Sequence, residues 1–188
     1  MKIILGSQSI YRKKILEEMG FDFEVMVSGI DEKAIRFKDP KELVAALAKA
    51  KADAIKPNIF EEAILITSDQ VVVWEKEIRE KPENEEEARR FLKSYGSSPV
   101  ETVTAVAVSN LATGETRIEV DIAKIYFSPF SENEISDIIA DGEVFCLAGG
   151  FSIDGERWEG HVQRVEGARD SVMGLPKEVT KRLIEEVI

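Results

Sequence analysis

An apolar run that is interrupted by an acid constrains the fold of this chain more than any other feature. Ala63–Ile66 has the composition of a buried β-strand, the segment Thr67-Ser68-Asp69-Gln70 follows it, and Val71–Val73 resumes the β-type pattern. A carboxylate buried at the end of such a strand costs roughly several kcal/mol unless a cation, a hydrogen-bond donor or a metal compensates. Ligands of α/β proteins bind outside the carboxyl ends of the strands, so Asp69 is predicted to be catalytic. The alternative is an Asp that caps a turn.

Helical and β-type patterns alternate along the rest of the chain. Helices are predicted over residues 7–19, 40–55, 85–95, 131–140 and 177–187. Strands are predicted over residues 2–6, 21–27, 63–68, 71–74, 78–80, 100–109, 116–127 and 143–151. This order predicts an α/β fold in which helices flank a mixed, twisted β-sheet. Residues 1–188 are expected to form one domain, with a hairpin-rich second lobe within about residues 70–150 and a cleft between the lobes.

The composition excludes several classes of function. The net charge of −11 disfavours binding to nucleic acids and to anionic membranes. No apolar stretch approaches the roughly 20 residues of a membrane helix, and Lys2–Leu5 is no secretory signal. Cys146 is the only cysteine, which rules out an internal disulfide, fits a cytoplasmic setting and predicts a small core residue.

The same negative charge also repels a nucleotide, so a local group of cations or a divalent metal would have to reverse the field at a phosphate site. Arg12 follows the predicted strand 2–6 near a helix N-terminus, where free N–H groups and Ser7 favour phosphate. Lys51 and Lys81 are further candidates. Taken alone, Lys51 is better explained as a lysine extended along an apolar stripe, and Lys81 as a surface charge.

Two acids are candidates for binding a hard cation such as Mg²⁺ through oxygen ligands. Glu32 and Asp69 suffice, because magnesium commonly takes one or two carboxylates together with phosphates and water. Asp69 can instead, or in addition, accept a proton from an attacking water molecule, and the sequence does not separate the two roles. Asp31 is the neighbour most easily confused with Glu32, and its alternative role is solvation of a loop.

Several short motifs, each weak alone, occur together in a fixed order. They are Ile4-Leu5-Gly6-Ser7-Gln8-Ser9 with Tyr11-Arg12, Ile30-Asp31-Glu32, Leu47-Ala48-Lys49-Ala50-Lys51-Ala52, Ser68-Asp69-Gln70-Val71-Val72, Lys81-Pro82, Ala148-Gly149-Gly150-Phe151 and Gly174-Leu175-Pro176. At these spacings the chain resembles the Maf family of nucleoside triphosphate pyrophosphatases from residue 3 to about residue 184. The last motif is interpreted as the entry to the final helix.

The resemblance implies an activity, a fold and a set of site residues. Maf proteins hydrolyse nucleoside triphosphates between the α and β phosphates with a divalent cation (Mg²⁺, Mn²⁺ or Co²⁺). They have a two-lobed α/β fold of the ITPase-like kind around a central cleft, and many are homodimers. By resemblance, Asp69 matches the catalytic acid. The matching substrate-binding residues are Ser7, Arg12, Glu32, Lys51 and Lys81.

The resemblance also implies a base. One Maf subgroup prefers dTTP and UTP and carries Ala-Asp-Thr at the catalytic acid. Another prefers 7-methyl-GTP and carries Ser-Asp-Gln with an acid in the loop after the glycine-rich segment, which Ser68-Asp69-Gln70 and Asp154 match. A cationic methylated guanine is favoured by an aromatic face by roughly 0.5–2 kcal/mol, and by a nearby carboxylate. Tyr11, Gln70 and Asp154 are therefore the predicted specificity residues.

Three other functions stay open at this stage. The protein could be a pyrophosphatase that prefers dTTP and UTP. It could also be a nucleotide-binding regulator of cell division without catalysis, or a phosphatase that releases orthophosphate from the γ position. The retained acids and lysines favour catalysis over binding alone.

Overall fold

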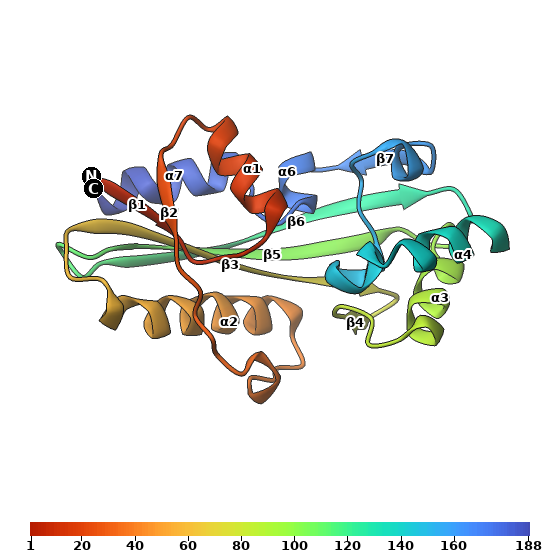
Figure 1. Cartoon of the computed structure of the whole chain (residues 1–188), viewed down its shortest axis with the longest axis horizontal. Helices are drawn as coiled ribbons and strands as arrows, with labels where there is room; N and C mark the ends of the chain where they lie inside the picture. Colours follow the sequence, from red (N-terminus) through yellow and green to blue (C-terminus); the bar gives the residue numbers. More distant parts are fainter. The chain divides into compact units, whose positions relative to one another are not determined.

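The computed structural model describes residues 1–188, and Figure 1 shows the chain coloured along its sequence. The chain divides into two compact units. The first unit comprises Met1–Gln70, Thr104–Asp121 and Met173–Ile188, and the second comprises Val71–Val103 and Ile122–Val172. Each unit is thus built from segments that are distant in the sequence, because three long strands contribute to both.

The sheet is mixed, as predicted. Strand β1 (Lys2–Leu5) pairs in parallel with β2 (Phe23–Val25) and with β3 (Ala63–Trp74), and Ile3 lies opposite both Phe23 and Ile64. The order of the seven-stranded sheet is β2-β1-β3-β5-β6-β7, with β4 paired to β3. Strands β5 (Val100–Asn110) and β6 (Thr116–Phe127) form the predicted long hairpin.

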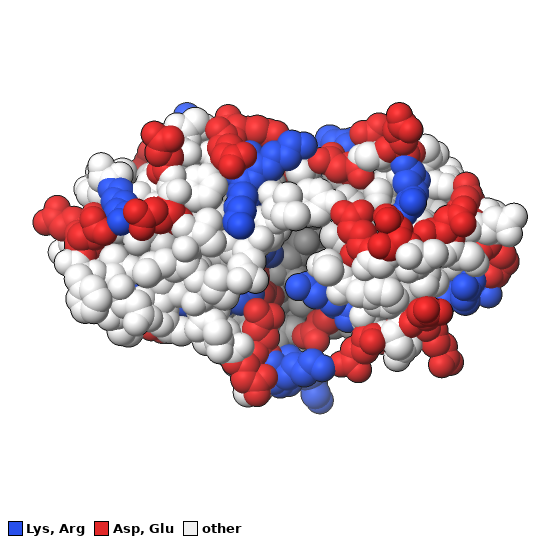
Figure 2. Space-filling view, viewed as in Figure 1, with Lys and Arg blue, Asp and Glu red and all other residues white.

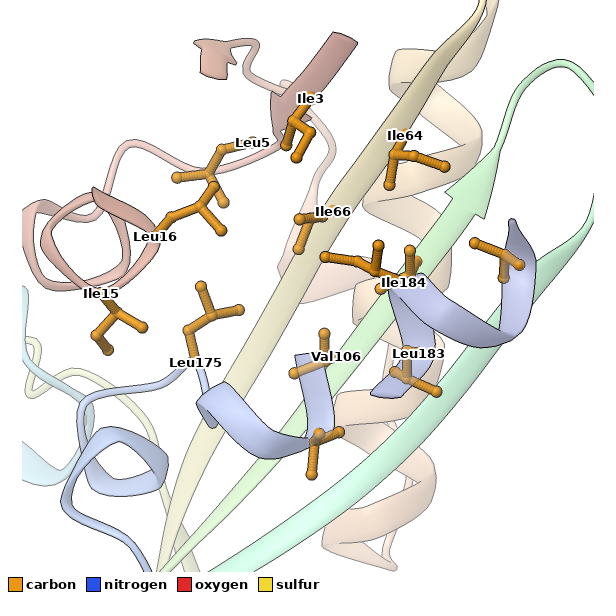
Figure 3. Close-up of a cluster of buried hydrophobic side chains, with 13 residues drawn as sticks. Ile3, Leu5, Ile15, Leu16, Ile64, Ile66, Val106, Leu175, Leu183 and Ile184 are labelled. Carbon is orange, nitrogen blue, oxygen red and sulfur yellow. The ribbon is translucent and has the colours of Figure 1, made fainter. Parts of the chain in front are cut away.

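Helices cover the sheet of the first unit through two apolar clusters. The helices of this unit are α1 (Ile10–Glu18), α2 (Pro40–Ile55) and α7 (Lys177–Val187), with 3₁₀ turns η1 (Glu32–Ala34) and η2 (Lys56–Asn58). Ile3, Leu5 and Ile66 pack with side chains of α1 and α7, as Figure 3 shows. Ile4 and Leu65 instead pack with residues of α2. Since alternate residues of a strand face opposite sides, the continuous apolar runs of β1 and β3 reflect burial on both faces.

The second unit combines the remaining parts of the three long strands with several short elements. Strand β4 (Glu77–Arg79) pairs with the end of β3 in antiparallel fashion, and β7 (Val162–Glu166) pairs with β6. The helices are α3 (Glu85–Ser94), α4 (Glu132–Asp141), α5 (Glu156–Glu159) and α6 (Arg169–Val172), with 3₁₀ turns η3 (Glu143–Cys146) and η4 (Ala148–Gly150). Phe127 packs against Tyr95, Phe130 and Phe151 in the core of this unit.

Residues 143–151 were predicted to form a strand, and that prediction is wrong. They form η3 and η4, because Gly149 and Gly150 adopt positive φ angles of 65° and 71° that a strand cannot contain. Cys146, predicted to lie in the core, is exposed as a result. No strand was predicted at β7, because the two valines of Val162–Glu166 lie three positions apart and do not give the alternation of a strand.

The charged surface matches the composition. Figure 2 shows acidic side chains spread over the visible face with basic side chains among them, in agreement with the net charge of −11. Among the helices, not one reaches both the length and the apolar character that crossing a membrane requires.

Candidate active site

The turn after β1 brings the start of α1 against β3. The Gly6 amide donates to the carbonyl oxygen of Ile66 at 2.7 Å. A Cβ atom on Gly6 would lie 2.5 Å from Thr67 Cγ2 and 2.8 Å from Ile55 Cδ1, so only glycine permits this approach. Thr67 Oγ1 donates to the Ala48 carbonyl oxygen at 2.7 Å and so attaches α2 to the same part of β3.

Asp69 lies inside a strand rather than at its end, which corrects the prediction. Strand β3 continues unbroken to Trp74 because β4 provides a second partner from Val72 onward. The parallel pairing with β1, however, ends at Ile66, opposite Leu5. Asp69 therefore lies just beyond the carboxyl end of β1, where an α/β protein presents ligand-binding groups.

Two carboxylates converge on one buried ammonium. Lys51 Nζ lies 2.5 Å from Asp69 Oδ1 and 2.9 Å from Glu32 Oε1. The side chains of Lys51 and Asp69 are 11% and 8% exposed, whereas that of Glu32 is 54% exposed. Lys51 is thus no surface lysine along an apolar stripe, but the centre of an ion-pair cluster that is open on the Glu32 side.

The 3₁₀ turn η1 explains why Glu32, and not Asp31, takes part in this cluster. Asp31 caps η1, and its Oδ1 accepts from the Lys33 amide at 3.1 Å. This local hydrogen bond holds Asp31 at the turn, while the next side chain reaches Lys51. Asp31 therefore stabilises the turn, while Glu32 belongs to the ion-pair cluster.

Arg12 is fixed by backbone carbonyl oxygens. Its Nη1 donates to the Ser68 carbonyl oxygen at 2.8 Å and to Ser7 Oγ at 3.4 Å, and its Nε donates to the Gly174 carbonyl oxygen at 3.0 Å. Ser68 Oγ donates to the same Gly174 oxygen at 2.7 Å. Gly174 has a φ of +92°, and a Cβ atom there would lie 3.1 Å from Arg12 Nε. The interpretation of Gly174 as a helix entry missed this second role.

The surroundings shift the pKa values of two of these groups. Burial raises the pKa of the Asp69 carboxyl, Lys51 and Arg12 oppose this shift, and the charge of Glu32 adds to it. Burial lowers the pKa of the Arg12 guanidinium, against the opposing effect of Asp69 and Glu32. A buried carboxylate with increased proton affinity is a suitable proton acceptor, and shifted pKa values are a common sign of functional sites.

Lys81 belongs to the second unit and lies beside its glycine-rich segment. It is exposed, in the loop between β4 and α3. On one side of it, the Glu80 carbonyl oxygen accepts from the Gly149 amide at 2.9 Å. On the other side, a Cβ atom on Gly150 would be 3.4 Å from Pro82 Cγ. The Lys81 loop and the glycine-rich segment are therefore held together within this unit.

The predicted specificity residues are distributed over both units. Tyr11 lies in α1 and is half-buried. Gln70 Nε2 donates to Thr104 Oγ1 at 2.7 Å, also in the first unit. Asp154 lies in the second unit, in the loop before α5, and its amide donates to Ser152 Oγ at 3.2 Å. Their role in choosing the base stays a prediction.

The donor set of the cluster suits a hard divalent cation. The structure contains no group of three or more His, Cys, Asp or Glu side chains placed to hold a metal. Glu32 and Asp69 nevertheless direct carboxylate oxygens at one positive charge, that of Lys51. Magnesium commonly binds through one or two carboxylates, with substrate phosphates and water as its other ligands. These two residues therefore fit such an ion.

These features define an α/β protein with a buried acid among fixed cations. The family model described as Maf-like protein matches residues 2–187. The chain therefore belongs to the Maf family, as the sequence motifs predicted.

Curated relatives match over almost the whole chain. A 7-methyl-GTP pyrophosphatase of Dictyostelium discoideum is 42% identical and covers 98% of this chain and 96% of its own. A nucleoside triphosphate pyrophosphatase of Synechococcus sp. (strain JA-3-3Ab) is 35% identical, with 98% and 93% covered. A dTTP/UTP pyrophosphatase of Vibrio cholerae is 33% identical, with 98% and 97% covered.

Proposed function

We propose that this Maf-family protein hydrolyses nucleoside triphosphates between the α and β phosphates, giving a nucleoside monophosphate and pyrophosphate. The observation that carries the proposal is the buried cluster of Asp69, Lys51 and Glu32. Mere nucleotide binding does not need a buried acid, because a carboxylate repels phosphate. The names of the relatives, all pyrophosphatases of nucleotides, support the same activity.

The residues of the cluster and the polar residues of the sequence motifs have different tasks in this reaction. Asp69 accepts the proton of the water that attacks the α phosphorus, and Lys51 opposes the rise in the pKa of this carboxyl that burial causes. Arg12 and Ser7 stabilise negative charge on the phosphate oxygens as pyrophosphate leaves. Lys81 supplies a further cation to the phosphates. Because hydrogen bonds to backbone oxygens hold Arg12 in place before substrate arrives, little reorganisation is needed.

Glu32 and Asp69 are also the residues that would hold the divalent cation, Mg²⁺, Mn²⁺ or Co²⁺. When bound, such an ion supplies positive charge to the phosphate oxygens and makes water a better nucleophile. Lys51 contacts both carboxylates and so offsets part of their mutual repulsion. Measuring activity against the concentration of each metal identifies the preferred ion.

We further propose that the base is 7-methylguanine. Asp154 provides a carboxylate and Tyr11 an aromatic ring, the two groups that favour a positively charged base. Ser68-Asp69-Gln70 matches the subgroup that prefers 7-methyl-GTP, and a relative that shares 42% of its residues with this chain carries that substrate in its name. The competing candidates are dTTP and UTP, which relatives near 33% identity have in their names.

The test is a panel of 7-methyl-GTP, GTP, dTTP and UTP with Mg²⁺ or Mn²⁺, in which the products are identified by chromatography. We expect monophosphate and pyrophosphate, with 7-methyl-GTP turned over fastest. Turnover of dTTP and UTP at least as fast would contradict the proposed base. Orthophosphate as the first product would indicate a phosphatase acting on the γ position, and binding without turnover would indicate a regulator.

We also propose that the protein is a cytoplasmic homodimer. The lone, exposed Cys146 and the absence of a disulfide fit the cytoplasm. The net charge of −11 disfavours nucleic acids and anionic membranes as partners. A homodimer follows from the family resemblance, and light scattering on the purified protein tests it.

A further inference from the structure

An arginine stands beside the carboxylate proposed to recognise the base. Arg169, the first residue of α6, lies within the second unit together with the Asp154 loop. Its Nη2 donates to the Ile153 carbonyl oxygen at 2.8 Å and lies 3.5 Å from Asp154 Oδ1. Arg169 belongs to none of the sequence motifs above and is not part of the cluster of Asp69, Lys51 and Glu32.

The geometry fixes the positive charge rather than leaving it mobile. The Arg169 side chain is 53% exposed, and an exposed ion pair alone is weak and easily broken. Here the same nitrogen that approaches Asp154 is hydrogen-bonded to the main chain one residue earlier. Asp154, 29% exposed, is held in turn by the bond from its amide to Ser152 Oγ. The cation therefore stays within ion-pair distance of the carboxylate.

We propose that Arg169 limits the selectivity for a positively charged base by partly neutralising Asp154. This inference rests on the proposed function, in which Asp154 faces the base. A carboxylate that already has a cation at 3.5 Å attracts a second one less strongly, and the guanidinium repels a cationic ring. A neutral purine is little affected. The wild-type protein is therefore expected to act on neutral purine triphosphates as well, and to prefer 7-methyl-GTP only moderately.

The main test removes the positive charge of Arg169 and keeps a polar side chain. In Arg169→Gln, a neutral amide takes the place of the guanidinium, so the side chain stays polar but the positive charge is gone. We expect the ratio of kcat/KM for 7-methyl-GTP to kcat/KM for GTP to rise about fivefold, the scale of one exposed charge contact. The rise should come from a lower KM for 7-methyl-GTP at unchanged kcat, since the base is remote from the reacting phosphate.

Matched variants separate charge from loop support. Arg169→Lys keeps the charge and should leave the ratio near the wild-type value. Asp154→Asn should lower the ratio, and Arg169→Gln should then have no further effect in the double variant. Arg157→Gln is the control, because it removes a nearby positive charge whose ion-pair partner is Asp141, at 2.8 Å, rather than Asp154.

The outcomes are distinct from those of the proposed function. An unchanged or lower ratio in folded Arg169→Gln overturns the role of Arg169, even if the wild type prefers 7-methyl-GTP. A wild type without that preference contradicts the proposed base. In that case, a preference that emerges in Arg169→Gln still supports the neutralisation of Asp154, and its failure to emerge refutes it.

Discussion

Each unit buries a cation, and the groups that surround the two cations differ. In the first unit, Lys51 is 11% exposed and its ammonium contacts two carboxylates, those of Asp69 and Glu32. In the second unit, Arg79 is 1% exposed. Its guanidinium carbon lies 4.4 Å from the ring centre of Trp74, 4.6 Å from that of Phe91 and 5.3 Å from that of Tyr95.

Arg79 supports a segment rather than a reaction. Its Nη1 donates to Ser94 Oγ at 2.7 Å, and its Nε donates to Glu77 Oε2 at 2.8 Å. The ring of Tyr95, which Arg79 contacts, carries a hydroxyl that donates to the Gly149 carbonyl oxygen at 2.7 Å. Burial raises the pKa of Tyr95, so this hydroxyl stays protonated and remains a donor. Arg79 thereby helps to hold the glycine-rich segment in place.

The difference shows which buried charge is available for chemistry. Aromatic rings stabilise a cation without offering a proton acceptor or a metal ligand, and Arg79 has one carboxylate partner, Glu77, where Lys51 has two. The carboxylates around Lys51 can do both, and Glu32 is half exposed, so a substrate or an ion can compete for these groups. We therefore expect changes at Lys51 and its acids to affect turnover first, and changes at Arg79 to affect stability first.

The largest expected effect is on turnover. Asp69→Asn should lower kcat by at least about a hundredfold, because the amide cannot accept the proton of the attacking water. Denaturant unfolding should show that the variant is still folded. Asp53→Asn, an exposed Asp in α2 that pairs with Lys49, is the control and should keep wild-type turnover. Near wild-type turnover in Asp69→Asn would remove this residue from the mechanism.

Exchanging the two cations for apolar residues tests the comparison itself. Arg79→Ala leaves a gap between three rings and should lower the free energy of unfolding by about 2–3 kcal/mol, with little change in kcat per folded molecule. Lys51→Met should instead lower kcat by more than about tenfold. Urea titration and steady-state kinetics measure both variants. Equal loss of stability and activity in the two would abolish the distinction.

A smaller effect is expected from the turn that positions Ser7 and Arg12. Gly6→Ala places a Cβ atom 2.5 Å from Thr67 Cγ2, which forces β1 and β3 apart. We expect a loss of about 1–3 kcal/mol in the free energy of unfolding, together with weaker substrate binding. Gly160→Ala is the matched control, since its nearest contact would be 3.9 Å away. Wild-type stability and KM in Gly6→Ala would show that the approach is not tight.

The smallest expected effect is the change of the free energy of unfolding with pH. It is measured with a chelator present, so that no metal binds. Because burial raises the pKa of Asp69, its contribution to stability is full below the pKa of the unfolded chain and is lost as pH rises through the raised folded value. The stability of the wild type relative to Asp69→Asn should therefore fall with rising pH in this range.

Asp53 provides the opposite sign. Burial acts against its ionisation, but Lys49 and Lys56 outweigh it and lower the pKa. Its contribution is therefore lost as pH falls. Parallel pH profiles for Asp53→Asn and Asp69→Asn would contradict one of the two signs.

Patterns that are local in sequence predicted much of this fold. Pro40 and the stripe of Leu43, Val44 and Leu47 predicted α2 with its observed bounds, because capping and burial act within a few residues. The strand predicted over residues 143–151 was wrong, because an apolar run does not reveal that Gly149 and Gly150 turn the backbone. The β-type run through Asp69 was divided too early, because its continuation depends on pairing with β4.

The site was predictable in its residue types and not in its supports. Glu32, Lys51 and Asp69 could be named from motifs, and the structure brings them together. The Gly174 carbonyl oxygen that holds Arg12 lies 162 residues away in the sequence. A backbone oxygen carries no side-chain signal, so only the folded chain reveals which carbonyl is used. The same holds for the contact between Arg169 and the Ile153 carbonyl oxygen.

The most direct test of the account is hydrolysis of 7-methyl-GTP in ¹⁸O-labelled water, with the products analysed by mass spectrometry. We predict label in the nucleoside monophosphate and none in pyrophosphate, because the proposed mechanism directs water to the α phosphorus. Asp69→Asn should form labelled monophosphate at least about a hundredfold more slowly. Label in pyrophosphate, or release of labelled orthophosphate, would contradict the account.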